Sequence, residues 1–154
     1  MPAFVKNGPN IPEPLLQAHE EGRVVFFTGA GISVPAGLPL FRGLVDEIYN
    51  SLGTSKSPVE AKAYEKDQYD STLDLLERRY PGKRAAVRAV VPEILKPNWR
   101  RKGATEVHEA LLQLSTDRKG STRLVTTNFD RIFQRVIERR GLRGFEWVDI
   151  GISG

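Results

Sequence analysis

The most informative absence in this sequence is cysteine, which does not occur among its 154 residues. Without thiols the chain can form neither a disulfide bond nor a thiolate-ligated zinc site. Its two histidines alone could not supply an ordinary structural zinc site, so we expect no zinc and no other metal. Long apolar runs are also missing: residues 24–27 are far too few to span a bilayer. We therefore expect a soluble, cytoplasmic protein without membrane contact.

Net charge and chain length exclude fewer functions than the absence of cysteine does. The 23 lysines and arginines exceed the 19 acidic residues by a modest +4, which suits an anionic ligand without demanding nucleic acid. A chain of this length can bury a core of its own, so we expect one domain over residues 1–154.

Two segments near the start of the chain predict a strand followed by a helix. Residues 23–28 lack polar alternation, which is typical of a strand buried on both faces of a parallel sheet. Pro39 suits the first turn of the helix that follows. The apolar stripe of this helix consists of Phe41, Leu44, Val45, Ile48 and Leu52. We expect that stripe to pack on the sheet.

The rest of the chain predicts further helices and two further strands. Residues 57–97 have a helical pattern throughout, which indicates a helical insertion at about 54–103. A helix over 106–114 has an apolar face of Val107, Ala110, Leu111 and Leu114. Strands are expected at 123–126 and 145–150, separated by a helix whose apolar face is Phe129, Ile132, Phe133, Val136 and Ile137. This alternation predicts an α/β fold with a doubly wound parallel sheet, in which ligands bind beyond the carboxyl ends of the strands.

The segment VVFFTGAGISVPAGLPLFR at 24–42 places a glycine-rich loop at such an end. Gly29 and Gly31 lack side chains, so backbone N–H groups can approach an anion such as a diphosphate. The usual dinucleotide fingerprint GxGxxG would require glycine where Val34 stands, and no lysine precedes Ser33 as in a phosphate-binding P-loop. A tight strand-to-helix turn without a ligand is the alternative.

Three short motifs give the chain a family resemblance. GAGISVPAGLPLFR at 29–42 resembles the sirtuin segment GAGxSxxxGIPDFR, and TTNFD at 126–130 resembles the sirtuin TQNID. A softer likeness is TEVHEALLQL at 105–114, because sirtuins carry a histidine-bearing helix ahead of TQNID. The resemblance covers about residues 11–150 and implies a Rossmann-like fold that binds NAD.

The resemblance also implies roles for particular residues. Arg42 would reach the phosphates, Phe41 would cover the ribose carbon that nicotinamide leaves, and Thr127 stands at the glutamine of TQNID among the cofactor-binding residues. Asn128 would position a water or the ribose hydroxyls, and Asp130 would hold the nicotinamide carboxamide. The diphosphate cradle would consist of Gly29, Ala30, Gly31 and Ser33.

Structural alternatives exist for most of these residues. Phe41 also opens an apolar stripe, and Arg42 could be a solvated charge. Asn128 is a good helix cap, and Asp130 is favourable in a first helical turn. We interpret His108 mainly as a packing residue.

The departures from the sirtuin pattern bear on the reaction. Leu40 replaces the aspartate before Phe-Arg, and Phe129 replaces the isoleucine of TQNID. The four-cysteine zinc module of sirtuin deacylases cannot exist here, so deacylation is disfavoured. The chain is instead similar to divergent bacterial sirtuin-like domains, whose implied activity is NAD hydrolysis, often as the effector of a phage-defence system.

Sirtuins use a histidine after TQNID, but neither His19 nor His108 follows Asp130. We therefore expect an N-terminal portion of a longer domain, incomplete at its C-terminus, with the catalytic histidine beyond residue 154. A further C-terminal region or a partner effector or sensor protein is expected, and a homo-oligomer is compatible with the sequence.

The leading hypothesis is an NAD hydrolase that cleaves the nicotinamide–ribose bond to give nicotinamide and ADP-ribose. Such cleavage passes through an oxocarbenium-like state, so the protein must hold the ribose, fix the departing base and admit a water. Alternatives are an NAD or ADP-ribose sensor without turnover, and an NAD-dependent deacylase or ADP-ribosyltransferase. Nucleic-acid binding through KPNWRRK at 96–102 and RKGSTR at 118–123 is a third class, but such basic runs are usually solvated, so direct binding is not expected.

Overall fold

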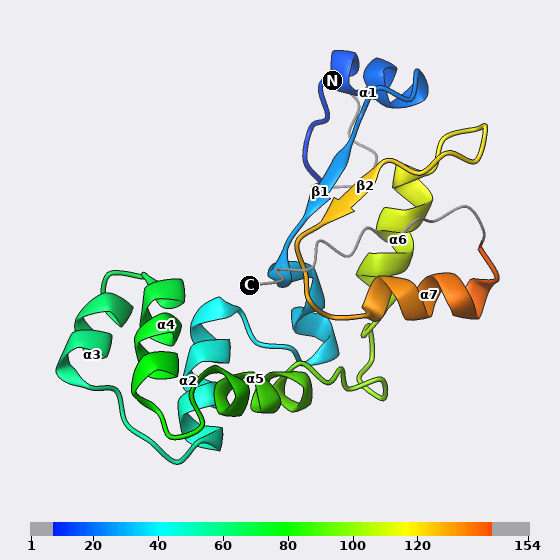
Figure 1. Ribbon diagram of the computed structural model, residues 1–154. Helices are drawn as coiled ribbons and strands as arrows, with labels where there is room; N and C mark the ends of the chain where they lie inside the picture. Colours follow the sequence, from blue (N-terminus) through cyan, green and yellow to red (C-terminus); the bar gives the residue numbers. More distant parts are fainter. Residues whose placement is uncertain (1–7, 143–154) are drawn as a thin grey trace.

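The computed structural model describes residues 8–142 (Figure 1). Two strands, seven α-helices and one 3₁₀ helix lie in this range. In chain order they are α1 Glu13–Glu20, β1 Phe26–Thr28, the 3₁₀ helix η1 Ala30–Ala36, α2 Phe41–Ser51, α3 Pro58–Tyr64, α4 Tyr69–Arg79, α5 Lys83–Ile94, α6 Glu106–Ser115, β2 Leu124–Thr126 and α7 Ile132–Arg140. Within the same range no helix combines the length and apolar character needed to cross a membrane.

The two strands form a small parallel sheet. Phe26 pairs with Leu124 and Thr28 with Thr126, although about a hundred residues separate the strands. The prediction of a mixed α/β fold with parallel strands is therefore confirmed. The described range contains these two strands rather than a doubly wound sheet, and the predicted strand at 145–150 lies outside it.

The two faces of the sheet have different surroundings. On one face Leu124 packs against the core that α6 and α7 build. The other face presents Phe27, which is 72% exposed, together with Val25 and Val125, which are also exposed. Burial on both faces was therefore a wrong prediction for the described residues, because helices cover this sheet on one side.

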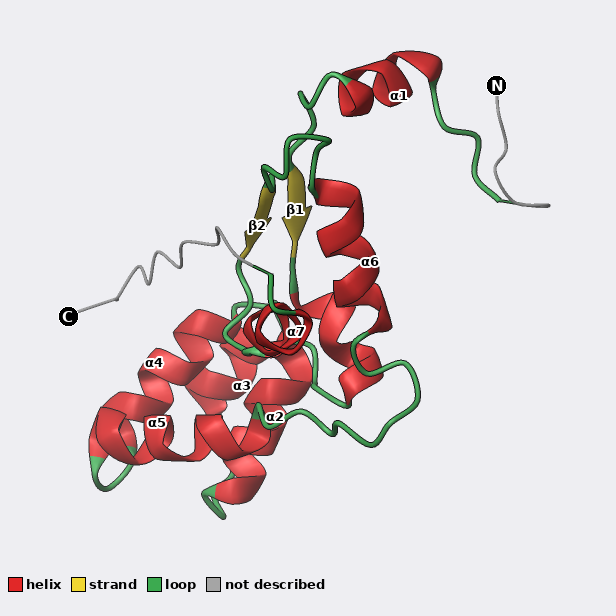
Figure 2. Cartoon of the chain, turned by 90° about the vertical axis from the view of Figure 1, so that its right-hand side faces the viewer, coloured by secondary structure: helices red, strands yellow, loops and turns green. Residues whose placement is uncertain are grey.

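Helices α2 to α5 lie beyond the carboxyl ends of the strands (Figures 1 and 2). They contain a hydrophobic cluster of their own. The predicted helical stretch 57–97 is confirmed as α3, α4 and α5. The prediction that the stripe of α2 packs on the sheet is wrong, because Val45 and Ile48 pack with Leu76 of α4 and Val87 of α5. Pro39 also lies before α2 rather than in its first turn, since Leu40 is the N-cap.

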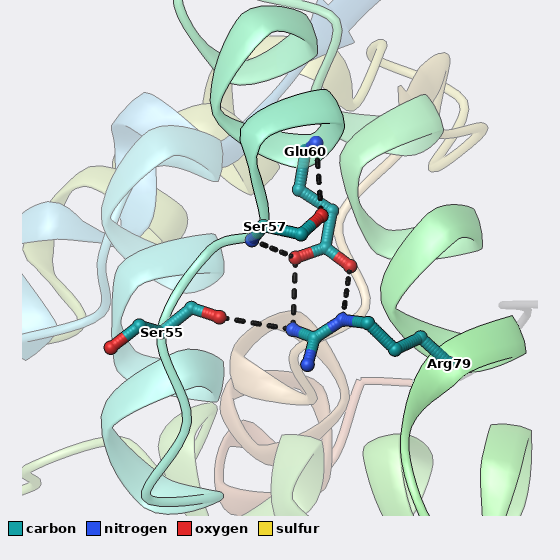
Figure 3. Close-up of polar contacts among 4 residues, drawn as sticks. All are labelled: Ser55, Ser57, Glu60 and Arg79. Carbon is teal, nitrogen blue, oxygen red and sulfur yellow. Dashed lines mark hydrogen bonds and ion pairs between the residues drawn. The ribbon is translucent and has the colours of Figure 1, made fainter.

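An ion pair joins α3 and α4 in this helical cluster (Figure 3). Arg79 donates from Nε to Oε1 of Glu60 at 2.8 Å and from Nη2 to Oε2 at 2.9 Å. Ser57 and Glu60 form a capping box, in which the Ser57 amide donates to Glu60 Oε2 at 2.7 Å. Burial raises the pKa of Glu60, but Arg79 and the Ser57 amide together lower it below its ordinary value. The buried carboxylate is thus satisfied from two elements.

The second hydrophobic cluster includes the buried apolar residues of α6 and α7. The apolar face predicted for α7 is buried from Ile132 to Ile137, whereas Phe129 lies before the helix and is 81% exposed. The face predicted for α6 is wrong in part: Leu111 packs against the core, but Val107 and Leu114 are exposed. The buried residues of that helix are His108, Leu112 and Ser115. Its inner side therefore includes a polar side chain that apolar periodicity could not assign.

Candidate functional site

The carboxyl ends of β1 and β2 open into one pocket. The Thr127 amide donates to the Thr28 carbonyl at 3.2 Å, so the two chains remain adjacent where the strands end. The pocket has a volume of about 210 Å³. Its lining consists of Ala30, Ser33, Leu38, Pro39, Phe41, Leu44, Leu95, Thr127, Asn128, Phe129 and Asp130. Leu38 belongs to one hydrophobic cluster and Leu44 to the other, so the pocket lies where the two clusters meet.

Most of the predicted site residues gather around this pocket. Those that line it are Ala30, Ser33, Phe41, Thr127, Asn128 and Asp130. Gly29 and Gly31 flank Ala30 in the chain, and Arg42 is absent from the lining. The structure thus brings the glycine loop and the TTNFD motif to one place.

Ser33 connects the two motifs. Its hydroxyl donates to Asp130 Oδ2 at 2.7 Å and accepts from Asn128 Nδ2 at 3.1 Å. His108 Nε2 lies 3.4 Å from the same oxygen. A hydroxyl has one proton to donate and two lone pairs to accept with, so the second lone pair faces a protonated Nε2. This arrangement makes Nδ1 the unprotonated nitrogen of the neutral ring.

His108 is a member of the site that the sequence analysis assigned to packing. It is fully buried, and its ring meets that of Phe133 edge to face at 4.7 Å. Burial lowers the pKa of His108 below its ordinary value, although the charge of Asp130 opposes this effect. Its Nδ1 atom is buried without a hydrogen-bond partner among the described residues. The softer likeness of 105–114 to a histidine-bearing helix was the available signal.

Asn128 and Asp130 have different structural roles. The prediction of Asn128 as a helix cap is wrong, because α7 begins at Ile132. Asp130 is the residue at the helix entrance, where Oδ1 accepts from the Ile132 amide at 3.0 Å. Asn128 Oδ1 is buried and has no partner among the described residues, although the residue lines the pocket. An unpaired buried acceptor is costly, so a donor from a ligand would be favourable there.

The backbone conformation does not require glycine at position 29 or at position 31. Gly29 has an extended backbone with φ of −131°, which any residue can adopt, and Gly31 is outside the set of positive-φ glycines. A Cβ at Gly31 would meet no described atom within 4 Å. By contrast Gly37 has φ of +86° and lies against Arg101, so it is needed for the turn. Bare backbone at 29–31 is consistent with room for a ligand.

Arg42 and Phe41 begin α2 at the edge of the pocket. The Arg42 Nε donates to the Tyr64 hydroxyl at 3.1 Å, and the guanidinium lies 5.1 Å from the Tyr64 ring centre. The Tyr64 hydroxyl in turn donates to Asp46 Oδ2 at 2.6 Å. Phe41 lines the pocket and also meets the Tyr69 ring edge to face at 5.5 Å. Arg42 is thus held by α3, whereas Phe41 serves both pocket and helix packing.

Comparison with known proteins gives one informative relative. The chain is 40% identical over 128 residues to "Uncharacterized protein y4cA" of Sinorhizobium fredii (strain NBRC 101917 / NGR234). The match covers 83% of this chain and 10% of y4cA, so the chain spans about a tenth of that protein's length. No family profile and no solved structure matches the chain.

Proposed function

We propose that the pocket binds NAD and that the protein hydrolyses its nicotinamide–ribose bond to give nicotinamide and ADP-ribose. The observation that carries this proposal is the unpartnered, buried Oδ1 of Asn128 in a pocket built from both sirtuin-like motifs. A ribose hydroxyl or a carboxamide N–H would satisfy that acceptor. The bare backbone of Gly29 and Gly31 adjoins the same pocket and suits a diphosphate.

With this function we also propose a more specific fold. We infer a Rossmann-like, doubly wound sheet of the sirtuin-like kind, with a helical insertion at about 54–103. The parallel pairing of β1 with β2, and the position of both motifs at the carboxyl ends, support this inference. NAD hydrolysis as a phage-defence effector, with a partner that triggers it, is the biological role that the resemblance favours.

The size of the pocket limits which part of NAD it would take. About 210 Å³ is below the 300–1,000 Å³ typical of whole small-molecule sites, so we assign it to the nicotinamide riboside end. The diphosphate would lie outside it against residues 29–31. Phe41 and Leu44 would close the apolar side, which excludes water from one face of the ribose.

Hydrolysis of this bond requires the protein to orient the ribose and the water rather than to protonate the departing nicotinamide. Water adds to the ribose carbon while the bond to nicotinamide breaks, and nicotinamide leaves as a neutral molecule with release of one proton to solvent. Asn128 would orient the ribose or the water through Oδ1. Ser33 would position Asn128 and Asp130 through its hydrogen bonds to both, and His108 would act on them indirectly through its contact with Ser33.

A sensor that binds NAD or ADP-ribose without turnover is the second candidate. One observation favours it: each carboxylate oxygen of Asp130 already accepts a hydrogen bond, from Ser33 and from the Ile132 amide. The carboxylate that lines the pocket is therefore committed to structure rather than free to act as a base. Transfer of ADP-ribose to an acceptor other than water would use the same bond cleavage.

Nicotinamide release and NAD binding, measured on the same samples, test the proposal. We expect Asn128→Ala to lower kcat about 100-fold, a typical loss for one transition-state hydrogen bond. Asn50→Ala, an exposed site on α2, is the matched control and should leave kcat unchanged. Gly31→Val should preserve the melting temperature but weaken NAD binding at least tenfold, because its added atoms enter open space beside the proposed diphosphate.

The outcomes separate the candidates. Binding without release in the wild type, weakened by Gly31→Val, would refute hydrolysis by this chain alone and leave binding as the function that the pocket supports. An absence of NAD binding in the folded wild-type chain would refute both.

A further inference from the structure

A second surface, which adjoins the pocket at Leu95, Phe129 and Asp130, combines the loop after α5 with the outer face of α7. The two segments lie side by side (Figure 1), and the Arg135 guanidinium lies 4.5 Å from the centre of the Trp99 ring. Two hollows of about 700 and 370 Å³ flank this pair, and both are lined by Trp99 and Arg135. We call this surface, with its loop residues 96–102 and the outer face of α7, the basic face.

The outer side of α7 carries cations at one spacing. Arg131, Arg135 and Arg139 are exposed and four residues apart, while the residues between them supply the buried stripe of the helix. Four residues rise about 6 Å along a helix, so the three guanidinium groups form a row on one side. This spacing follows from the amphipathic pattern, which leaves one side of α7 to solvent.

The loop adds further cations to this row. Arg100, Arg101 and Lys102 are exposed, and none of the six cations forms an ion pair with a carboxylate of residues 8–142. Other arginines, such as Arg79 and Arg123, do have such partners. The acidic groups that line the two hollows are Glu106, Asp130 and Glu138. Lys96 of the same loop pairs with Glu93, and Arg139 also lies in the field of Glu109. The six other cations still outnumber these carboxylates, which leaves the basic face with a net positive charge.

Contacts with the end of η1 also hold the loop at residues 98–101 in position. The Asn98 amide donates to the Ala36 carbonyl at 2.8 Å, and the Arg101 side chain lies against Gly37. These contacts attach residues 98–101 to the end of η1, the element that carries Ser33. A pre-positioned set of cations loses less conformational entropy on binding than a mobile tail does.

We propose that the basic face binds single-stranded nucleic acid. The unpaired guanidinium groups would contact successive phosphates, and Trp99, which is 39% exposed, would stack with a base. A protein partner is disfavoured because the cores of protein interfaces are depleted in charge, and a membrane would require a protruding apolar side that α7 buries instead. The KPNWRRK run alone predicted a solvated surface, and only folding places the α7 arginines beside it. This proposal does not depend on NAD binding.

Fluorescence anisotropy with a labelled oligothymidine of about 20 nucleotides tests it on the full chain. The variant Arg131→Gln/Arg135→Gln/Arg139→Gln should bind at least tenfold more weakly in low salt. Its plot of log affinity against log salt should be less steep by about 2, because each lost phosphate contact on a single strand removes about 0.7. Lys62→Gln/Lys66→Gln/Arg78→Gln removes the same charge from exposed positions on α3, on α4 and in the turn between them, and should change affinity less than twofold.

Trp99 provides the second readout. Trp99→Ala should weaken binding of the single strand about tenfold, with most of the loss restored in Trp99→Phe. Equal losses in the two triple variants would overturn the proposal, as would equally tight binding to a duplex or to polyglutamate. Failure of the folded wild type to bind the oligonucleotide in low salt would also overturn it.

Discussion

At the scale of single residues, the site depends on one hydroxyl. Ser33 satisfies its full hydrogen-bonding capacity with Asp130 and Asn128 of the TTNFD segment and with His108 of α6. A methyl group there would leave Asp130 and Asn128 without their shared partner at the edge of the pocket. The buried polar cluster therefore specifies the relative positions of η1, α6 and the TTNFD segment more than it adds net stability.

The buried neutral ring of His108 gives the protein a pH dependence of known sign. Because its pKa is lower in the folded state than its ordinary value of 6.5, the unfolded chain binds the proton first. The stabilising contribution is complete above that value and is lost as the pH falls below it. We expect the free energy of unfolding to fall by at most about 1.4 kcal/mol per pH unit from this group.

Chemical denaturation between pH 7.5 and 5 would measure this dependence, because both endpoints lie at least about one unit from the ordinary histidine pKa. His108→Gln should flatten the profile whatever it does to stability at pH 7.5. Asn50→Gln, at an exposed position on α2 without a titratable group, is the control and should retain the wild-type slope. A slope in His108→Gln equal to that of the wild type would contradict the assignment.

At the scale of elements, the contact between α3 and α4 depends on the ion pair of Glu60 with Arg79. Glu60 is buried whereas Arg79 is partly exposed, so the two partners are not equivalent. Removal of Arg79 leaves an uncompensated buried carboxylate and also frees the Ser55 carbonyl. We expect Arg79→Ala to lower the free energy of unfolding by about 3 kcal/mol.

The adjacent residue on α4 is the control for this prediction. Arg78 pairs with Asp74 on the surface of the same helix, where such pairs contribute about 0.5 kcal/mol or less. Urea unfolding of Arg79→Ala and Arg78→Ala measures both. Equal effects from the two substitutions would show that burial of Glu60 is not decisive.

At the scale of the whole molecule, two hydrophobic clusters meet at the pocket. One contains α2, α4 and α5, and the other lies under α6 and α7. The pocket takes Leu44 from the first cluster and Leu38 from the second. A change that loosens the first cluster should therefore open one wall of the pocket.

Leu76→Ala tests this division, since Leu76 is fully buried in the first cluster. A leucine-to-alanine change in a core costs about 2–5 kcal/mol. We expect faster amide hydrogen exchange in α2, α4 and α5, with little change in α6 and α7. Val59→Ala at an exposed site on α3 is the control, and uniform acceleration across both clusters would mean that they unfold as one unit.

Local pattern sufficed for the elements and for the position of the site. The helices at 58–94 and the strands ending at Thr28 and Thr126 follow from apolar periodicity, which is a property of neighbouring residues. The two motifs were expected at strand ends, and parallel pairing brings those ends together. The sequence by itself thus determined where helices and strands form and which loops meet at the pocket.

Only the tertiary structure decided what each apolar face packs against. A stripe shows that one side of α2 is buried, but contacts with Leu76 and Val87, rather than with the sheet, depend on residues distant in the chain. The inner side of α6 includes His108 because Ser33, 75 residues earlier, supplies a partner there. The role of Asp130 at the start of α7 and the alignment of the α7 arginines with Trp99 have the same origin. Such contacts are set by the packing of distant segments, which no local periodicity encodes.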